Sequence, residues 1–298
     1  MMARFRIPKM IDCAAKNDLL ASFPYLQDLK KSETFAGLIA DLDGWRVVGT
    51  DLDDRPYTIN VPHQIIRLNT RGLNTTSILR SQYFRNTLAF NLLCAVRAAW
   101  AAKPEQLTRR MHRPDLWPLI ARLSRADTAA MAVRMGFELL DDDRDQLWRH
   151  ILGDALGDIA QEYARILEAN FSAKDDHAAL SAAFLAWFDR PERVHASDAE
   201  TLASMDQGLP SLLWNGRGKL SEGAVRCISV DPISGSSYLG VHAGEIAGDP
   251  AWGDIADPIN RAHFMQIMED IGTTRVGSVA TRDENLARRL FPGLLERA

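Results

Sequence analysis

The sequence predicts an α+β protein in which helices predominate, and three observations support this fold class. Short β-branched segments come first, at residues 45–68. A segment of 26 residues without glycine or proline follows at 77–102, and a series of helical segments then continues to about residue 205. Strands that precede a run of helices, instead of alternating with them, are typical of the α+β class.

The first elements are an amphipathic helical region and a small group of strands. Residues 10–42 have a helical pattern, which we expect Pro24 and Gly37 to interrupt. Residues 45–50 and 57–61 flank a polar turn, which predicts a hairpin or meander that continues into 64–68.

The central element is the helix predicted at residues 77–102, which ends before Pro104. We expect this helix to pack beneath the small sheet. Trp100 and Trp187 lie in segments rich in alanine, leucine and phenylalanine, so both should be buried. The later helices are predicted at 116–140, 146–169, 175–188, 197–205, 257–271 and 283–290, and one further strand at 225–230.

A change in composition divides the chain. Glycine becomes frequent after Gly208, so we expect one domain at residues 1–207 and a glycine-rich C-terminal region at 208–298, packed on the first.

Composition limits the classes of function. The net charge is −4, which does not favour a nucleic-acid partner. The three cysteines are far apart, so neither a disulfide framework nor a paired-cysteine metal site is expected. The N-terminus lacks the apolar core of a signal peptide, and no segment has the length and apolarity of a membrane span. We therefore expect a cytoplasmic protein without a membrane partner.

Two groups of residues could carry chemistry. His242, Glu245 and His263 are metal-ligand types in or near a glycine-rich stretch, which leaves a non-standard metal site and a hydrolase as an alternative. The basic residues between Arg109 and Arg125 could instead recruit an acidic partner. The common nucleotide-binding, zinc-protease and serine-hydrolase motifs are absent from the sequence.

One segment of the long helix resembles a known family. The residues from Leu93 to Trp100 read LCAVRAAW. They are similar to the active-site helix of an uncharacterised bacterial family of zincin-like predicted metallopeptidases, whose pattern runs HELRHAW. This resemblance implies a zincin-like core with the sheet packed on helix 77–102.

Two later stretches extend the resemblance over about residues 40–205. The first, from Arg125 to Leu139, is similar to the alanine-rich acidic helix of the family, where Asp127 and Glu138 agree with the pattern. The second begins at Ala182 and reads AAFLAWFDRPERV, followed by Asp198, Thr201 and Leu202, and resembles the family pattern AFxAWFxDPxRVxxxDxxTL.

The departures from the family pattern decide the expected function. Cys94 and Ala98 stand where the family has its two metal-binding histidines, and Ala95 stands where it has the catalytic glutamate. Arg125 replaces the glutamate that the resemblance implies as third ligand, and it carries a permanent positive charge. A buried arginine needs a carboxylate, and Asp127 on the same helix faces elsewhere, so we expect Arg125 to pair with an acid from another segment or to be exposed.

The sequence therefore predicts a non-catalytic metallopeptidase-like protein with a binding or regulatory role and no resident cofactor. Its partner would be a protein or a small-molecule ligand. Cys94, Ala95, Ala98, Arg125 and Asp127 mark the degenerate site.

Overall fold

The computed structural model describes residues 19–72, 80–103, 112–140, 145–169, 176–208, 218–273, 275–276 and 279–280. Its contacts divide the chain into two units. Unit 1 comprises residues 1–103, 128–184 and 231–236, and unit 2 comprises 104–127, 185–230 and 237–298. Neither unit is one continuous stretch, so the units differ from the regions 1–207 and 208–298 expected from composition.

The sheet of unit 1 has three strands, β1 (Arg46–Thr50), β2 (Tyr57–Asn60) and β3 (Ile65–Asn69), in the order β1-β3-β2. β3 pairs in parallel with β1 and antiparallel with β2. The expected strand positions are confirmed, but the turn at 51–56 does not join neighbouring strands. The hairpin is formed by β2 and β3, and its turn contains Gln64 with a φ of +53°.

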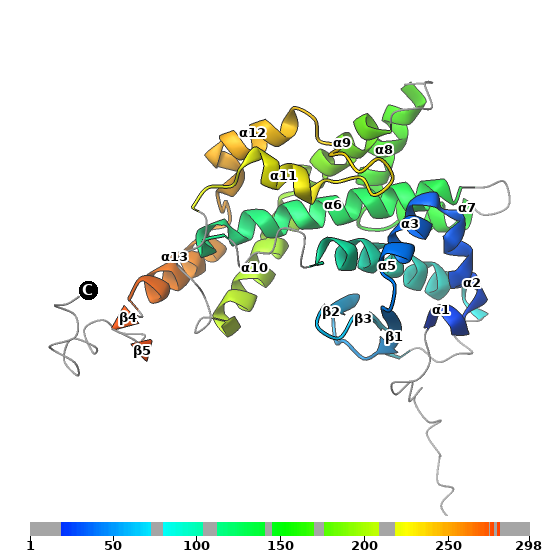
Figure 1. Cartoon of the computed structure of the whole chain (residues 1–298), viewed down its shortest axis with the longest axis horizontal. Coiled ribbons are helices and arrows are strands. Elements are labelled where there is room, and N and C mark those ends of the chain that lie inside the picture. Colours follow the sequence, from blue (N-terminus) through cyan, green and yellow to red (C-terminus); the bar gives the residue numbers. More distant parts are fainter. Residues whose placement is uncertain are drawn as a thin grey trace, which may run out of the picture. The chain divides into compact units, whose positions relative to one another are not determined.

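Helix α5 (Gln82–Ala101) is the central helix of unit 1. It contacts β2 and β3 of the sheet and also helices α3 and α7 (Figure 1). Because side chains alternate along a strand, Ile66 and Leu68 of β3 are both buried while their neighbours are only partly so. The predicted packing of the long helix on the sheet is confirmed, although its N-cap is Ser81 and the helix begins five residues later than expected.

The first helices of unit 1 are interrupted before Pro24, as expected, and at Ser32 instead of at Gly37. Pro24 begins a helix, where its missing N–H costs no hydrogen bond. Ser32 caps a later helix, which spans residues 33–41. Gly37 lies inside that helix, so the break expected there is wrong. The elements are α1 (Leu19–Ser22), α2 (Pro24–Gln27), the 3-10 helix η1 (Asp28–Lys31) and α3 (Glu33–Asp41).

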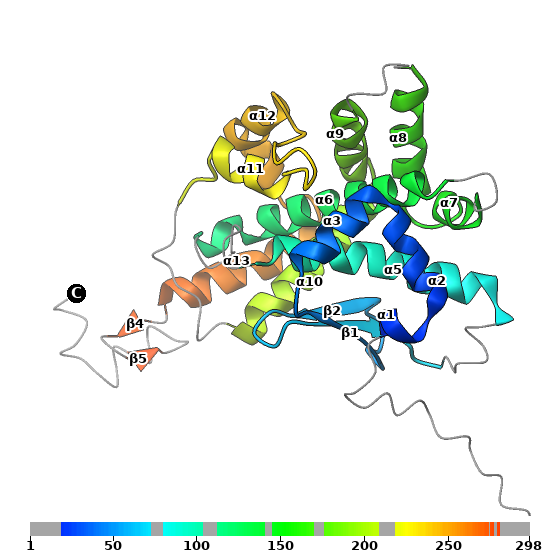
Figure 2. The same cartoon turned by 45° about the vertical axis from the view of Figure 1, so that its right-hand side comes forward.

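The remaining helices of unit 1 follow α5 in the chain (Figure 2). α6 (Trp117–Glu138) is continuous, and residues from Thr128 onward belong to unit 1. The others are α7 (Asp145–Leu152), α8 (Gly157–Ala169) and α9 (His177–Ala186).

Unit 2 contains two helix pairs. α10 (Pro191–Gly208) packs on α13 (Pro258–Thr273), and α11 (Glu222–Ile228) packs on α12 (His242–Gly248). Leu202 and Met205 of α10 form a buried cluster with Ile267 and Ile271 of α13. The shorter elements are the 3-10 helices η3 (Pro114–Leu116), η4 (Trp187–Asp189) and η6 (Pro250–Gly253), and the strands β4 (Arg275–Val276) and β5 (Val279–Ala280).

One expectation for the C-terminal region is wrong. Residues 225–230 were expected to form a strand, but most of them belong to α11, and Val230 makes an isolated bridge to Ser237. His242 and Glu245 of the glycine-rich stretch lie on helix α12. The helix predicted at 283–290 lies outside the described residues.

None of the described helices combines the length and apolarity that a membrane crossing requires.

Candidate functional site

The centre of α5 holds the three positions that correspond to the metal-binding and catalytic residues of the resembled family. Ser81 caps the helix by accepting a hydrogen bond from Phe84 N, and 20 residues without glycine or proline follow. Cys94 and Ala95 are buried and Ala98 is partly buried. Such a helix, apolar on most of its circumference, is typical of a core element.

The thiol of Cys94 is poorly suited to bind a metal or attack a substrate. Burial raises its pKa to about 12, and the negative charge of Asp154 acts in the same direction. Only the thiolate is a strong ligand and nucleophile, so Cys94 stays protonated at neutral pH. Ala95 and Ala98 have no donor atoms. The side chains at these positions therefore do not fit a zinc ion.

Residues of α5 that agree with the family pattern have structural contacts. The guanidinium of Arg97 lies 4.7 Å from the centroid of the Trp100 ring, and Trp100 Nε1 donates to Asp41 Oδ2 of α3 at 2.8 Å. Trp100 is 8% exposed and Trp187 is 4% exposed, so the predicted burial of both is confirmed.

Arg125 and Asp127 both lie on α6, in unit 2, and have separate partners. Arg125 Nη2 forms an ion pair with Glu200 of α10. This confirms that Arg125 pairs with an acid from another segment. Asp127 is fully buried and accepts a hydrogen bond from the Tyr238 hydroxyl at 2.9 Å.

The alternative site of His242, Glu245 and His263 is not assembled. His242 Nδ1 lies 2.7 Å from Glu245 Oε2, whereas His263 Nε2 lies 2.6 Å from Asp206 Oδ2. The described part of the chain contains no group of three histidine, cysteine, aspartate or glutamate side chains that could hold a metal ion.

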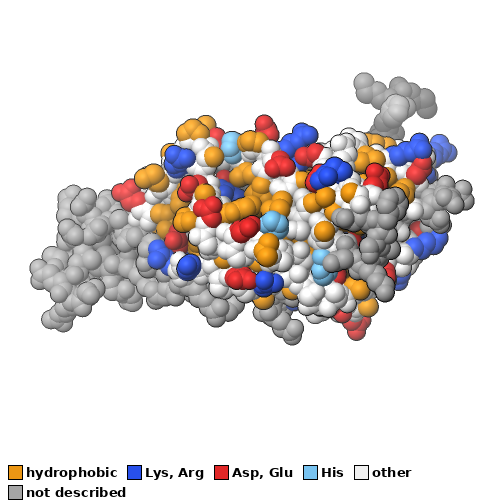
Figure 3. Space-filling model, turned by 90° about the horizontal axis from the view of Figure 1, so that it is seen from above, with side chains coloured by type: hydrophobic (Ala, Val, Ile, Leu, Met, Phe, Trp, Pro, Cys, Tyr) orange, Lys and Arg blue, Asp and Glu red, His pale blue; other side chains and the backbone are white. Residues whose placement is uncertain are grey.

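The described residues of the basic segment from Arg109 to Arg125 do not form a continuous charged surface. Arg109 and Arg110 lie outside the described residues. Arg122 is buried, with Nε and Nη2 bound to the two carboxylate oxygens of Asp198 at 2.7 and 2.8 Å. On the face shown in Figure 3, acidic and basic side chains of the described residues are interspersed.

Unit 1 contains a network of charges that sequence reasoning missed. Arg134 of α6 binds Glu138 Oε1 at 3.0 Å, Asp176 Oδ2 at 2.8 Å and Asp231 Oδ1 at 2.8 Å. Glu138 also accepts hydrogen bonds from the Ser32 and Thr34 hydroxyls at the start of α3. Only the spacing of Arg134 and Glu138, four residues apart on one helix, was visible in the sequence.

The same network places a serine, a histidine and an aspartate together. Ser234 Oγ lies 3.3 Å from His177 Nε2, and Asp231 Oδ2 lies 3.2 Å from the same nitrogen. Activation of a serine requires the hydroxyl and the carboxylate on opposite ring nitrogens. This arrangement is therefore a hydrogen-bonded loop anchor and not a catalytic triad.

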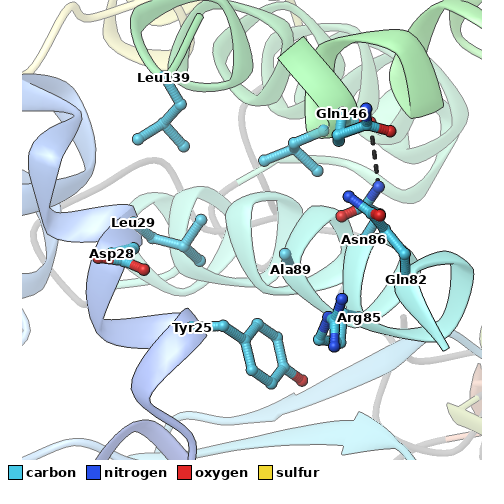
Figure 4. Close-up of a pocket in the computed structure, with 10 residues that line it drawn as sticks. Tyr25, Asp28, Leu29, Gln82, Arg85, Asn86, Ala89, Leu139 and Gln146 are labelled. Atoms are coloured by element: carbon cyan, nitrogen blue, oxygen red, sulfur yellow. Dashed lines mark hydrogen bonds between the residues drawn. The ribbon is translucent and has the colours of Figure 1, made fainter. Parts of the chain in front are cut away.

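A cavity of about 280 Å³ lies beside the first half of α5 (Figure 4). Its polar side chains come from α2, η1, α5 and α7, and Asn86 Nδ2 donates to the Gln146 carbonyl oxygen at 3.0 Å. Figure 4 shows the ring of Tyr25 extending from α2 towards Arg85. All lining residues belong to unit 1. No local pattern in the sequence indicates this cavity, because its walls come from distant segments.

Comparison of the chain with protein-family models, with curated protein sequences and with solved structures found no match.

Proposed function

We propose that this chain is a non-catalytic relative of the zincin-like metallopeptidases, which retains a helical scaffold and has a binding or regulatory role. The observation that carries the proposal is the chemistry of three positions on α5. Cys94 holds a protonated thiol, and Ala95 and Ala98 have no donor atoms. Metal-assisted hydrolysis needs ligands for the ion and a base for its water, and these side chains supply neither.

The alternative of a hydrolase centred on His242, Glu245 and His263 has less support, because the two histidines bind different carboxylates. A role as an arginine-rich interaction surface also has less support, since Arg122 and Arg125 are engaged by acids of α10.

The free thiols of Cys94 and Cys227 agree with the proposed reducing, cytoplasmic location.

The test is an assay of the purified full chain for bound zinc and for hydrolysis of casein, with and without a chelator, and with thermolysin as the positive control. We expect far less than one zinc per chain and no chelator-sensitive hydrolysis. Stoichiometric zinc together with chelator-sensitive turnover, lost in Cys94→Ala, would overturn the proposal.

The reactivity of the Cys94 thiol, which requires both access to the sulfur and its ionisation, can be measured in the same preparation. Native protein is treated with iodoacetamide at pH 8, and the modified peptides are identified by mass spectrometry. We expect the exposed Cys227 to be alkylated and Cys94 to react only after unfolding in urea. Rapid alkylation of Cys94 in the folded protein would remove the main support for the proposal.

A further inference from the structure

A second cavity of unit 1 lies where the first helices meet the start of the sheet. Its volume is about 230 Å³, somewhat below the usual range of small-molecule sites, which is about 300–1,000 Å³. The lining side chains come from α1, α2, η1, α3, β1, β3 and the segment between α3 and β1. A cavity of this size favours a small molecule over a segment of a protein.

Two side chains of opposite charge line this cavity. Lys30 lies on η1 and Asp43 follows α3, and both side chains are exposed. Neither of them forms a hydrogen bond or an ion pair within the described part of the chain, so they do not pair with each other. The neighbouring Lys31, in contrast, lies 3.6 Å from Asp28. The cavity therefore offers an accessible cation and an accessible anion to one ligand.

Trp45 adds a hydrogen-bond donor to the same lining. Its side chain is half-buried, and Nε1 keeps some accessible surface and has no acceptor among the described residues. The Nε1 atoms of Trp100 and Trp117, in contrast, donate to acceptors of the chain. An indole N–H and an ammonium group can only donate, so Trp45 and Lys30 both suit a carboxylate. Asp43 can only accept and suits an ammonium group.

The rest of the lining is mostly apolar. Val47 and Ile66 of the sheet are buried, whereas Ile39 of α3 and the ring of Trp45 are only partly buried. A ligand that covers Ile39 and the indole ring removes apolar area from water, which favours a hydrocarbon side chain on that ligand.

We propose that this cavity binds a free α-amino acid with an apolar side chain, with its carboxylate at Lys30 and Trp45 and its ammonium group at Asp43. The side chain of the amino acid lies against Ile39 and the indole ring. Each charge of this zwitterion meets an opposite charge, whereas a ligand with a single charge would leave one side chain of the lining without a partner. The inference deepens the proposed binding function and rests on it, because it names the class of ligand.

The test titrates the full chain with leucine, methionine and phenylalanine by isothermal titration calorimetry. The amino acid that binds most tightly is then compared with its N-acetyl form, which keeps only the negative charge, and with its amide, which keeps only the positive charge. We expect saturable binding of the free amino acid and about threefold to fivefold weaker binding of each blocked form, because the charged groups are exposed. Absence of binding by all three amino acids, or a blocked form that binds as tightly as the free one, would overturn the assignment.

Variants assign each charge of the ligand to one side chain. Asp43→Asn should weaken binding of the free amino acid about threefold to fivefold and leave the N-acetyl form unaffected, because that form has no ammonium group. Lys30→Gln should weaken binding of the free and N-acetyl forms and leave the amide unaffected. The matched controls are Asp54→Asn and Lys31→Gln, which alter exposed residues outside the lining and should change each affinity less than about twofold. Unchanged binding in both cavity variants would overturn the site.

Thermal unfolding gives a second readout. A ligand that binds only the folded state raises the unfolding temperature, so a saturating amino acid should shift the parent protein more than a variant that carries both Asp43→Asn and Lys30→Gln. Equal shifts in the two proteins would contradict the site. Failure of the wider proposal is recognised separately, since chelator-sensitive hydrolysis would appear in the zinc and casein assays whether or not an amino acid binds.

Discussion

Arg122 and Arg125 show how burial determines what an ion pair contributes to stability. They lie three residues apart on α6, and each binds a carboxylate of α10. The Arg122–Asp198 pair is buried, with side chains 3% and 0% exposed, and Arg122 also donates to the carbonyls of Trp252 and Asp254. The Arg125–Glu200 pair is 34% and 64% exposed.

Removing one partner from each pair should therefore have different effects on stability. Asp198→Ala leaves a buried guanidinium without its carboxylate and should cost about 3–5 kcal/mol of unfolding free energy. Glu200→Ala should cost about 1 kcal/mol or less, because water solvates both ions of an exposed pair. Urea denaturation of both variants measures the difference. Equal losses would show that burial does not determine the strength of these pairs.

Asp231 gives a prediction for acid conditions. Its pKa is lowered to about 2: burial raises it, but the charge of Arg134 and hydrogen bonds from Ile233 N, Ser234 and His177 together outweigh that effect. A lowered pKa in the folded state means that ionised Asp231 stabilises the fold above its unfolded pKa of about 3.9. This contribution is lost as the pH falls from about 4 towards 2.

The measurement compares the parent protein with Asp231→Asn by urea denaturation at pH 5, 4 and 3. We expect the variant to be less stable at pH 5 and the difference to shrink as the pH falls. The pKa of Asp176 is shifted in the opposite direction, upwards, chiefly by burial and in part by the charge of Asp231, so the upward shift is smaller in Asp231→Asn. A difference that stays constant with pH would contradict the assignment to Asp231.

Among the secondary-structure elements, the serine N-caps of α5 and α3 differ in their contacts: one binds only its own helix, and the other also binds a distant helix. Ser81 caps α5 through one hydrogen bond to Phe84 N. Ser32 caps α3 through Phe35 N and also donates to Glu138 Oε2 at 2.5 Å, which connects the start of α3 with the end of α6. Ser32 is fully buried.

Substitution of the two caps should separate local from tertiary stabilisation. Ser81→Ala should cost about 1 kcal/mol, the usual value of an N-cap. Ser32→Ala should cost about 2–3 kcal/mol, because it also removes a hydrogen bond to a carboxylate. Thermal or urea unfolding of each variant checks the order. A larger loss in Ser81→Ala would show that the contact with Glu138 adds no stability.

At the scale of the whole molecule, unit 1 depends on a segment from late in the chain. Residues 231–236 belong to unit 1, and Asp231 is one of the three carboxylates that bind Arg134. In unit 2, Leu202 and Met205 are covered by residues of α13. A division of the chain at residue 207 would interrupt both arrangements.

A fragment of residues 1–207 should therefore be less stable than the full chain. It lacks Asp231 and exposes Leu202 and Met205, so we expect a lower urea midpoint and increased binding of a dye specific for apolar surfaces. The full chain carrying Asp231→Asn serves as the control for the loss of that carboxylate alone. A fragment as stable as the full chain would show that the late segment is dispensable.

Features that depend on local pattern could be predicted from the amino-acid sequence alone. The long helix, the positions of the three strands and the burial of Trp100 follow from propensity and from the density of apolar residues. The absence of ligand atoms at Ala95 and Ala98 is likewise a property of residue identity alone.

Which distant residues meet depends on the tertiary structure. β3 lies between β1 and β2, and the composition of a turn does not specify such long-range pairing of strands. Residues 225–228 lie in helix α11 despite the β-branched side chains of Val225 and Ile228, since packing on α12 overrides local propensity. The burial of Arg122 and the cavity at Tyr25 depend on segments far apart in the chain, whose approach is set by the packing of whole elements and not by any local pattern.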